Sequence, residues 1–166
     1  MITSRFRLWS LFPILLLCVT ILITVFFLLN NDVVELIDNK PMFFVVFFGV
    51  FFFYSIFLLF WGELRTKCIK IEVNEASVTK RGFLGFGTTS TYKINEVEGY
   101  RISSLSSRSG TYEYLYLLVN EKKVIKISEF YHSNYLEMKT VIIRKNFKNL
   151  GVEQWSFLTE TKEIFQ

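Results

Sequence analysis

The segment between residues 80 and 86 has the residue types for binding chemistry: two cations, then aromatic and aliphatic side chains around glycines. Cations pair with lipid phosphates while aromatic rings enter the bilayer interface, and each basic residue near an anionic membrane contributes roughly 1 kcal/mol. The segment therefore offers four candidate contacts for anionic lipid headgroups or a protein partner: Lys80, Arg81, Phe83 and Phe86. In the alternative interpretation this is an ordinary turn, in which Phe83, Leu84 and Phe86 fill the fold and the cations are solvated.

Other residues with catalytic or ligating chemistry occur singly. His132 is the only histidine, and no Ser or Cys nucleophile with a base-orienting partner can be placed beside it. Cys18 and Cys68 lie far apart, so the sequence has no metal-ligand spacing. The glycines of 82–87 are not followed by the Gly-Lys-Ser/Thr of a phosphate loop. We predict no catalytic residues, no cofactor and no metal, and hence no enzyme.

Two long runs, 8–29 and 42–61, contain no charged residue. A helix of about 20 apolar residues spans about 30 Å, the thickness of the hydrocarbon core of a bilayer. A signal peptide is the competing interpretation of the first run, but its apolar region would be shorter and would end in small residues. We predict two transmembrane helices.

The distribution of charge predicts the orientation of these helices. Basic residues lie outside the two runs: Arg5, Arg7, Arg65, Lys67 and Lys70. The segment 30–41 between the runs carries three acidic residues and one lysine. Because positive residues are retained on the cytoplasmic side, we expect a helical hairpin in the cytoplasmic membrane with both termini and the following domain in the cytoplasm.

After residue 62 the apolar runs give way to alternation, which is typical of half-buried strands. The segment 112–119 is apolar or aromatic on both faces and should be a central strand. Residues 103–110 are expected to form a polar loop. Six strands with short turns imply an antiparallel sheet that curls or closes into a barrel, over 69–73, 76–80, 88–94, 98–104, 112–119 and 123–127.

One helix is predicted to close the fold. Asn134 is a suitable N-cap with Glu137 three residues later, and Gly151 is a suitable stop. Apolar-face positions recur at helical spacing at Leu136, Thr140, Ile143, Phe147 and Leu150, beside Met138 and Ile142. We expect a transmembrane hairpin over 1–62, a β domain with its helix over 63–151, and a tail over 152–166.

Net charge excludes one class of partner. The formal charge of the 166 residues is +4, mildly basic and suited to an anionic surface, but far from that of a nucleic-acid-binding protein. We predict no nucleic-acid partner.

The order of elements resembles bacterial membrane proteins in which a two-helix hairpin precedes a pleckstrin-homology-like (PH-like) domain. The resemblance covers about 8–151 and rests on the paired spans, the hairpin 69–80, the turn Gly82-Phe83-Leu84-Gly85, the step Ile94-Asn95-Glu96-Val97 and the single closing helix. It implies a membrane-anchored α+β protein whose PH-like barrel or curled sheet is capped by one helix.

Three function classes remain open from the sequence. The first is a non-catalytic, membrane-tethered binding or scaffolding module at the cytoplasmic face. The second is an accessory or immunity-type subunit that contacts a larger membrane complex through its transmembrane helices. An enzyme is the third and the least supported.

Overall fold

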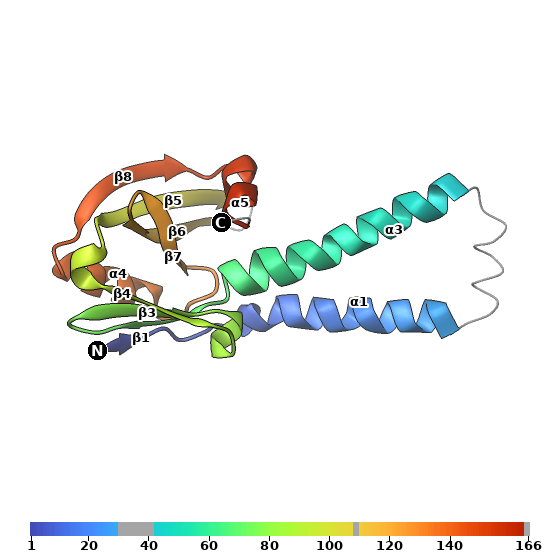
Figure 1. Ribbon diagram of the computed structural model, residues 1–166, viewed down its shortest axis with the longest axis horizontal. Coiled ribbons are helices and arrows are strands. Elements are labelled where there is room, and N and C mark those ends of the chain that lie inside the picture. Colours follow the sequence, from blue (N-terminus) through green and yellow to red (C-terminus); the bar gives the residue numbers. More distant parts are fainter. Residues whose placement is uncertain (30–41, 108–109, 165–166) are drawn as a thin grey trace.

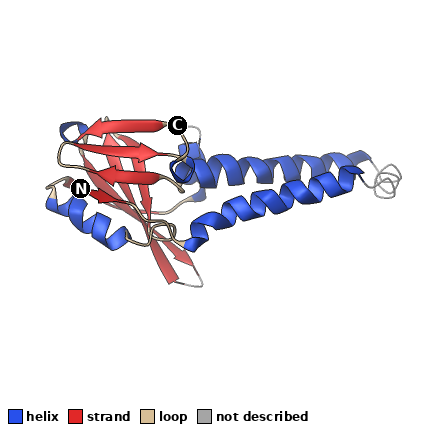
Figure 2. Cartoon of the chain, turned by 90° about the horizontal axis from the view of Figure 1, so that it is seen from below, coloured by secondary structure: helices blue, strands red, loops and turns tan. Residues whose placement is uncertain are grey.

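Two long apolar helices extend from one end of a β-rich body (Figures 1 and 2). A computed structural model describes residues 1–29, 42–107 and 110–164. The first helix has a 3-10 turn η1 (Leu8–Leu11) and then α1 (Phe12–Leu29), and the second has α3 (Met42–Phe57) followed by a π-helical segment η2 (Leu58–Leu64). The change to π geometry at Leu58 interrupts the predicted second run 42–61.

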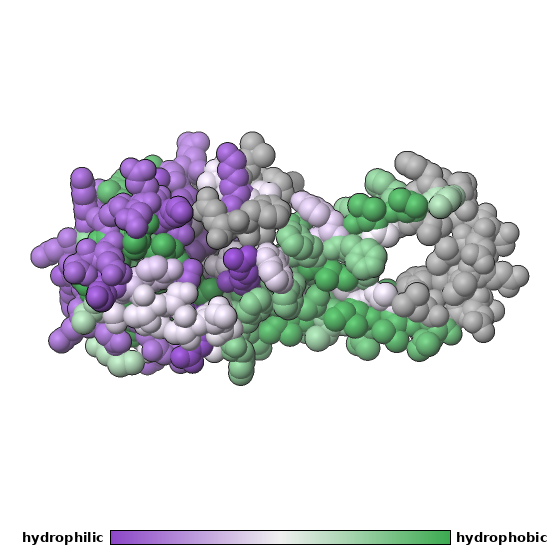
Figure 3. All heavy atoms as spheres, in the orientation of Figure 1, coloured by the Kyte–Doolittle hydropathy of each residue, from purple (hydrophilic) through white to green (hydrophobic). Residues whose placement is uncertain are grey.

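The surface of the helices is suited to lipid. Figure 3 shows apolar atoms gathered on the helices and hydrophilic atoms over the β-rich body. Leu8–Phe26 is long and apolar enough to cross a membrane and is only 11% buried, whereas the apolar stretch Gly49–Leu64 is shorter. Of the two predicted spans, the first therefore has a helix of sufficient length, and membrane insertion and orientation stay predictions.

The strands form two four-stranded sheets. The first has the order β1-β2-β3-β4, all antiparallel, and the second has the order β7-β6-β5-β8, with only β8 parallel to its neighbour. Their bounds are β1 Ile2–Thr3, β2 Lys70–Val73, β3 Ser77–Arg81, β4 Thr89–Lys93, β5 Gly99–Ser107, β6 Gly110–Val119, β7 Lys122–Ser128 and β8 Lys148–Gln154.

The six predicted strands correspond to β2 through β7, and β6 is an inner strand as predicted. The prediction of a polar loop over 103–110 is wrong for 103–107 and for Gly110, because β5 continues through Ser107 and β6 begins at Gly110; residues 108–109 lie outside the described residues. The strands also do not close into a barrel: the described strands form two separate sheets. Edge strands β4 and β7 belong to different sheets.

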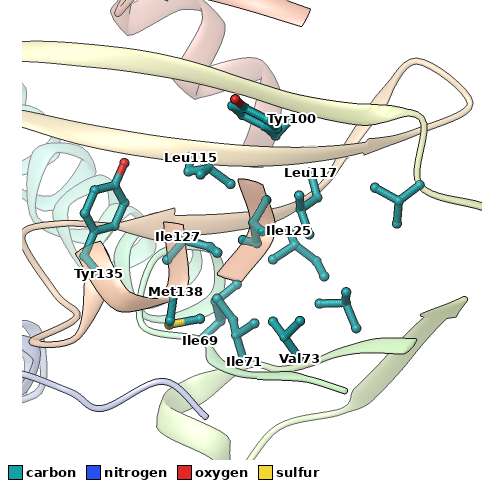
Figure 4. Packing of buried hydrophobic residues seen from close by; sticks show 13 residues of the cluster. Ile69, Ile71, Val73, Tyr100, Leu115, Leu117, Ile125, Ile127, Tyr135 and Met138 are labelled. Carbon is teal, nitrogen blue, oxygen red and sulfur yellow. The ribbon is translucent and has the colours of Figure 1, made fainter. Parts of the chain in front are cut away.

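One apolar core joins the two sheets and a helix (Figure 4). Alternation places side chains of each sheet on the inner face, so those of β2 meet those of β6 and β7. Tyr135 and Met138 of α4 (Tyr135–Arg144) complete the cluster. Fully buried members include Ile71, Val78, Leu115, Leu117, Ile127 and Ile142.

The predicted helix to residue 150 is wrong beyond Arg144. Asn146 takes a left-handed conformation with φ of 55°, which ends helical geometry, and β8 then pairs with β5. This pairing satisfies backbone groups along an otherwise open edge of β5. At Gly99 a β-carbon would lie 2.2 Å from the carbonyl oxygen of Lys148, so the close approach of the strands requires glycine there. Gly151, predicted as the helix stop, lies within β8.

The buried face of α4 is also one residue away from the predicted one. Ile142 is fully buried, whereas Leu136 is 68% and Ile143 is 47% exposed. Asn134 is the N-cap residue, as predicted, but its side chain makes no capping hydrogen bond. It accepts a hydrogen bond from Arg5 N and donates one to the Thr3 carbonyl.

These bonds belong to an N-terminal arm, defined here as residues 1–7. β1 of the arm pairs with β2, and the Ser4 hydroxyl accepts a hydrogen bond from Ile71 N at 2.8 Å. Phe6 forms a bridge with His132, whose ring is fully buried. The imidazole nitrogens Nδ1 and Nε2 lie 2.9 Å from the carbonyl oxygens of Ser128 and Ile69. His132 is therefore a core residue that ties together distant parts of the chain.

Ile142→Asp should unfold the β-rich body, because an unpaired carboxylate would enter the apolar core at a cost of several kcal/mol. The matched control is Ile143→Asp on the adjacent, half-exposed position, which should cost less than about 1 kcal/mol. Urea unfolding in detergent, followed by tyrosine fluorescence, measures both. Equal destabilisation by the two substitutions would contradict this packing of α4.

His132 should make stability depend on pH. Burial lowers its pKa below the usual 6.5, although the two carbonyl contacts oppose this shift. As the pH falls below 6.5 the unfolded imidazole gains a proton before the folded one does, so stability declines with falling pH, by up to about 1.4 kcal/mol per unit. Urea unfolding between pH 7 and pH 5 should show this slope in the wild type and a smaller one in His132→Gln. An unchanged slope would remove His132 as its source.

Candidate functional site

A cleft of about 350 Å³ lies in the opening between the two sheets, beside the end of η2. We call it the basic cleft. One wall has Lys80 of β3 with Ser90 and Tyr92 of β4, and the other has residues of β6 and β7. Its cations are Arg65, Lys80, Lys122, Lys123 and Lys126, and no Asp or Glu is among the described residues that line it.

The cations differ in how they are neutralised. Lys123 forms an ion pair with Glu153, and Lys126 forms one with Glu160 at 3.1 Å. Both carboxylates lie outside the lining of the cleft. The ammonium groups also lie over aromatic rings: Lys123 is 4.2 Å from the centre of the Tyr116 ring. Such contacts offset part of the cost of burying the two ammonium groups.

Lys80 has a different environment from these paired lysines. Its Nζ donates to the carbonyl oxygen of Val124 at 2.6 Å and lies 5.9 Å from the centre of the Tyr92 ring. Burial, with a contribution from the nearby Arg65 charge, lowers its pKa. An anion in the cleft would favour the charged form of Lys80, so binding of the anion and protonation of Lys80 would support each other.

The four residues singled out in the sequence do not act as one group. Lys80 and Phe83 line the basic cleft, whereas Arg81 and Phe86 do not. Adjacent residues of a strand point to opposite faces, so Arg81 is exposed and its Nε donates to the Thr89 hydroxyl at 3.0 Å. Phe86 is 93% exposed.

The turn that carries Phe83 has an unusual backbone. Phe83, Leu84 and Gly85 all have positive φ, at 50°, 57° and 102°. Leu84 N donates to the Cys68 carbonyl at 2.7 Å, which fixes the turn against the segment after η2. The Phe83 ring then lies 5.1 Å from the ring of Phe60 in η2. Phe83 is thus a packing residue at the helix end of the cleft, in part as the structural-turn alternative predicts.

A chain of charged and polar groups continues from the cleft toward the helices. Glu160 contacts Lys126 and also Lys67, at 2.8 Å. Lys67 pairs with Glu63 of η2 at 2.6 Å, and Glu63 accepts a hydrogen bond from the Tyr131 hydroxyl at 2.6 Å. Burial alone would lower the pKa of Lys67, but Glu63 and Glu160 together raise it. These groups hold the β-rich body to the end of the helix.

Sequence reasoning missed most cations of the cleft. Arg65, Lys122, Lys123 and Lys126 come from segments distant from residue 80 in the chain, and the fold gathers them there. Lys126 is only 6% exposed, because Tyr114 and Glu160 cover it. The sequence shows these cations only as three lysines within 122–126, a pattern that is also typical of a solvent-exposed strand.

Cys68 and His132 are both buried and are held in unreactive settings. Burial raises the pKa of the Cys68 thiol to about 12, with a contribution from Glu63, so the thiol stays protonated. The His132 ring is committed to backbone atoms. Within the described ranges there is also no cluster of three His, Cys, Asp or Glu side chains suited to a metal.

No family model, no curated protein and no solved structure matches this chain significantly. The resemblance to PH-like membrane proteins stays a prediction, and the argument for function rests on the geometry of the basic cleft.

Proposed function

We propose that this protein is a non-catalytic, membrane-tethered binding module that holds a phosphate-bearing anion in the basic cleft at the cytoplasmic membrane surface. The observation that carries the proposal is the lining of the cleft, which has five cations and no carboxylate among its described residues. Ammonium and guanidinium groups are the usual protein donors to phosphate oxygens. A cavity of about 350 Å³ is large enough for a phosphorylated headgroup or a similar small anion.

The position of the cleft supports a lipid source for the phosphate. Arg65 directly follows η2, and Phe83 of the cleft contacts Phe60 of the same helix. If the apolar helices lie in a bilayer, the cleft is held at its surface, where the effective concentration of headgroups is high. A modest intrinsic affinity is then sufficient for occupancy.

A binding role also fits the state of the reactive side chains. The Cys68 thiol and the His132 imidazole, the groups most suited to nucleophilic or acid-base chemistry, are buried away from the cleft lining. The aromatic rings of Tyr92 and Tyr116 provide apolar walls around the cations. Such a lining stabilises a bound anion without offering a route to its chemical change.

Lys80→Met should weaken binding of the full-length chain to anionic lipid headgroups about fivefold, because one cation near the anion contributes roughly 1 kcal/mol. Methionine retains the apolar stem of the side chain. The chain would be placed in detergent micelles, and its affinity for a short-chain phosphatidylinositol phosphate measured by titration calorimetry. Inorganic pyrophosphate in a parallel titration tests a free anion as the ligand.

Arg81→Met is the matched control, since it removes the same charge from the opposite face of β3. It should leave both affinities within about twofold and should keep the salt dependence of the wild type. Equal losses in the two variants, or a wild type that binds neither the lipid nor pyrophosphate at low salt, would reject the cleft as an anion site. The second function class, a subunit that contacts partners through its helices, would then be favoured.

The orientation in the membrane has its own test. In a chain with Cys18 and Cys68 replaced by Ser, a cysteine introduced at Glu35 should react with an impermeant thiol reagent in intact cells. A cysteine at Glu121, in the exposed turn between β6 and β7, should react only after the cells are lysed. Glu35 lies outside the described residues. Labelling of Glu121→Cys in intact cells would place the β-rich body on the outer side.

A further inference from the structure

The C-terminal helix α5 (Phe157–Ile164) brings a carboxylate to a cation of the cleft. The Glu160 carboxylate accepts hydrogen bonds from Lys126 at 3.1 Å and from Trp155 Nε1 at 2.7 Å. It also contacts Lys67, which does not line the cleft. Glu160 is therefore an internal anion shared between the basic cleft and the base of the helices.

The contact is largely shielded from solvent. The Lys126 side chain is 7% exposed and that of Glu160 is 14% exposed. Burial alone would raise the pKa of Glu160, yet Lys67 and Lys126 hold it at about 2. At neutral pH the carboxylate is thus charged and already compensates part of the positive charge that a ligand of the cleft would meet.

We propose that Glu160 competes with the bound anion for Lys126, so that occupancy of the basic cleft and docking of α5 oppose each other. The inference rests on the proposed function, because it assigns a regulator to the same site. Two anions that share one ammonium group repel each other, and the repulsion is strong where water is scarce. Coupling of this kind is reciprocal: α5 lowers the affinity of the cleft, and the anion loosens α5 by the same factor.

The Glu160 carboxylate also connects anion binding in the cleft to the helices, through its ion pair with Lys67. When Glu160 leaves, Lys67 keeps its ion pair with Glu63 of η2, so the body stays attached while α5 is released. A cavity of about 360 Å³ lies beside this point, between α1, the end of the second helix and α5, and is lined by Glu63, Lys67 and Glu160. Release of α5 would open this apolar space at the base of the helices, which gives the bound state a different surface from the empty one.

The test compares the full-length wild type with Glu160→Gln in nanodiscs of zwitterionic lipid. Glutamine still accepts hydrogen bonds but carries no charge. Pyrophosphate, measured by titration calorimetry, should bind the variant about fivefold more tightly or better, as expected for a typical coupling between sites. Hydrogen exchange should show faster exchange of the α5 amides in the wild type at saturating pyrophosphate, with the β6 amides unchanged.

Glu137→Gln is the matched control, because Glu137 is exposed on α4 and lies outside the lining of the cleft. It should bind pyrophosphate like the wild type. Equal affinity in wild type and Glu160→Gln, or α5 exchange that pyrophosphate does not change, would overturn the coupling while the anion site stands. Absence of pyrophosphate binding in both proteins rejects the anion site and the coupling together. Binding by Glu160→Gln alone would support the coupling and show that the wild-type cleft is closed to free anions.

Discussion

The attachment of the N-terminal arm to β2 is the constraint on which the remaining arrangement depends. Ser4 N donates to the Ile71 carbonyl at 2.7 Å, and Arg7 N donates to the Tyr131 carbonyl at 2.9 Å. The chain therefore enters the first helix from the same sheet at which it arrives after the second. Both helices must start and end at one end of the β-rich body, as Figure 1 shows. The position of the basic cleft beside η2 follows from this shared junction.

The junction between the β-rich body and the helices also contains buried ion pairs. A body joined to apolar helices needs contacts that hold its orientation, and Lys67 provides them through Glu63 on one side and Glu160 on the other. Buried ion pairs give little net stability, since desolvation offsets most of the attraction, but removal of one partner is strongly unfavourable. The network therefore specifies one arrangement of body and helix more than it stabilises the fold. Glu63 lies in the π-helical segment η2, a geometry that is rare and often occurs at functional sites.

The sequence predicted those features that depend on local periodicity. Alternation located β2 through β7, and uninterrupted apolar runs located the helices. Features decided by distant contacts were missed. β8 (Lys148–Gln154) forms because β5 offers an edge, although the sequence predicted a helix up to residue 150 and a tail from residue 152. Four of the five cations of the cleft were missed for the same reason, since Arg65 and the lysines of β7 meet Lys80 only in the folded chain. Lys80 and Arg81 were grouped by adjacency, although strand geometry separates them.

The distribution of negative charge explains how a cleft with five cations persists in a folded chain. Like charges within a few ångströms oppose folding unless anions or solvent compensate them. Glu153 pairs with Lys123 and Glu160 pairs with Lys126, and neither glutamate lines the cleft. Lys80 instead relies on the Val124 carbonyl and the Tyr92 ring, partners that stabilise an ammonium group less than a carboxylate does. Lys80 lies at the side of the cleft that Arg65 and Phe83 also line, next to the end of η2.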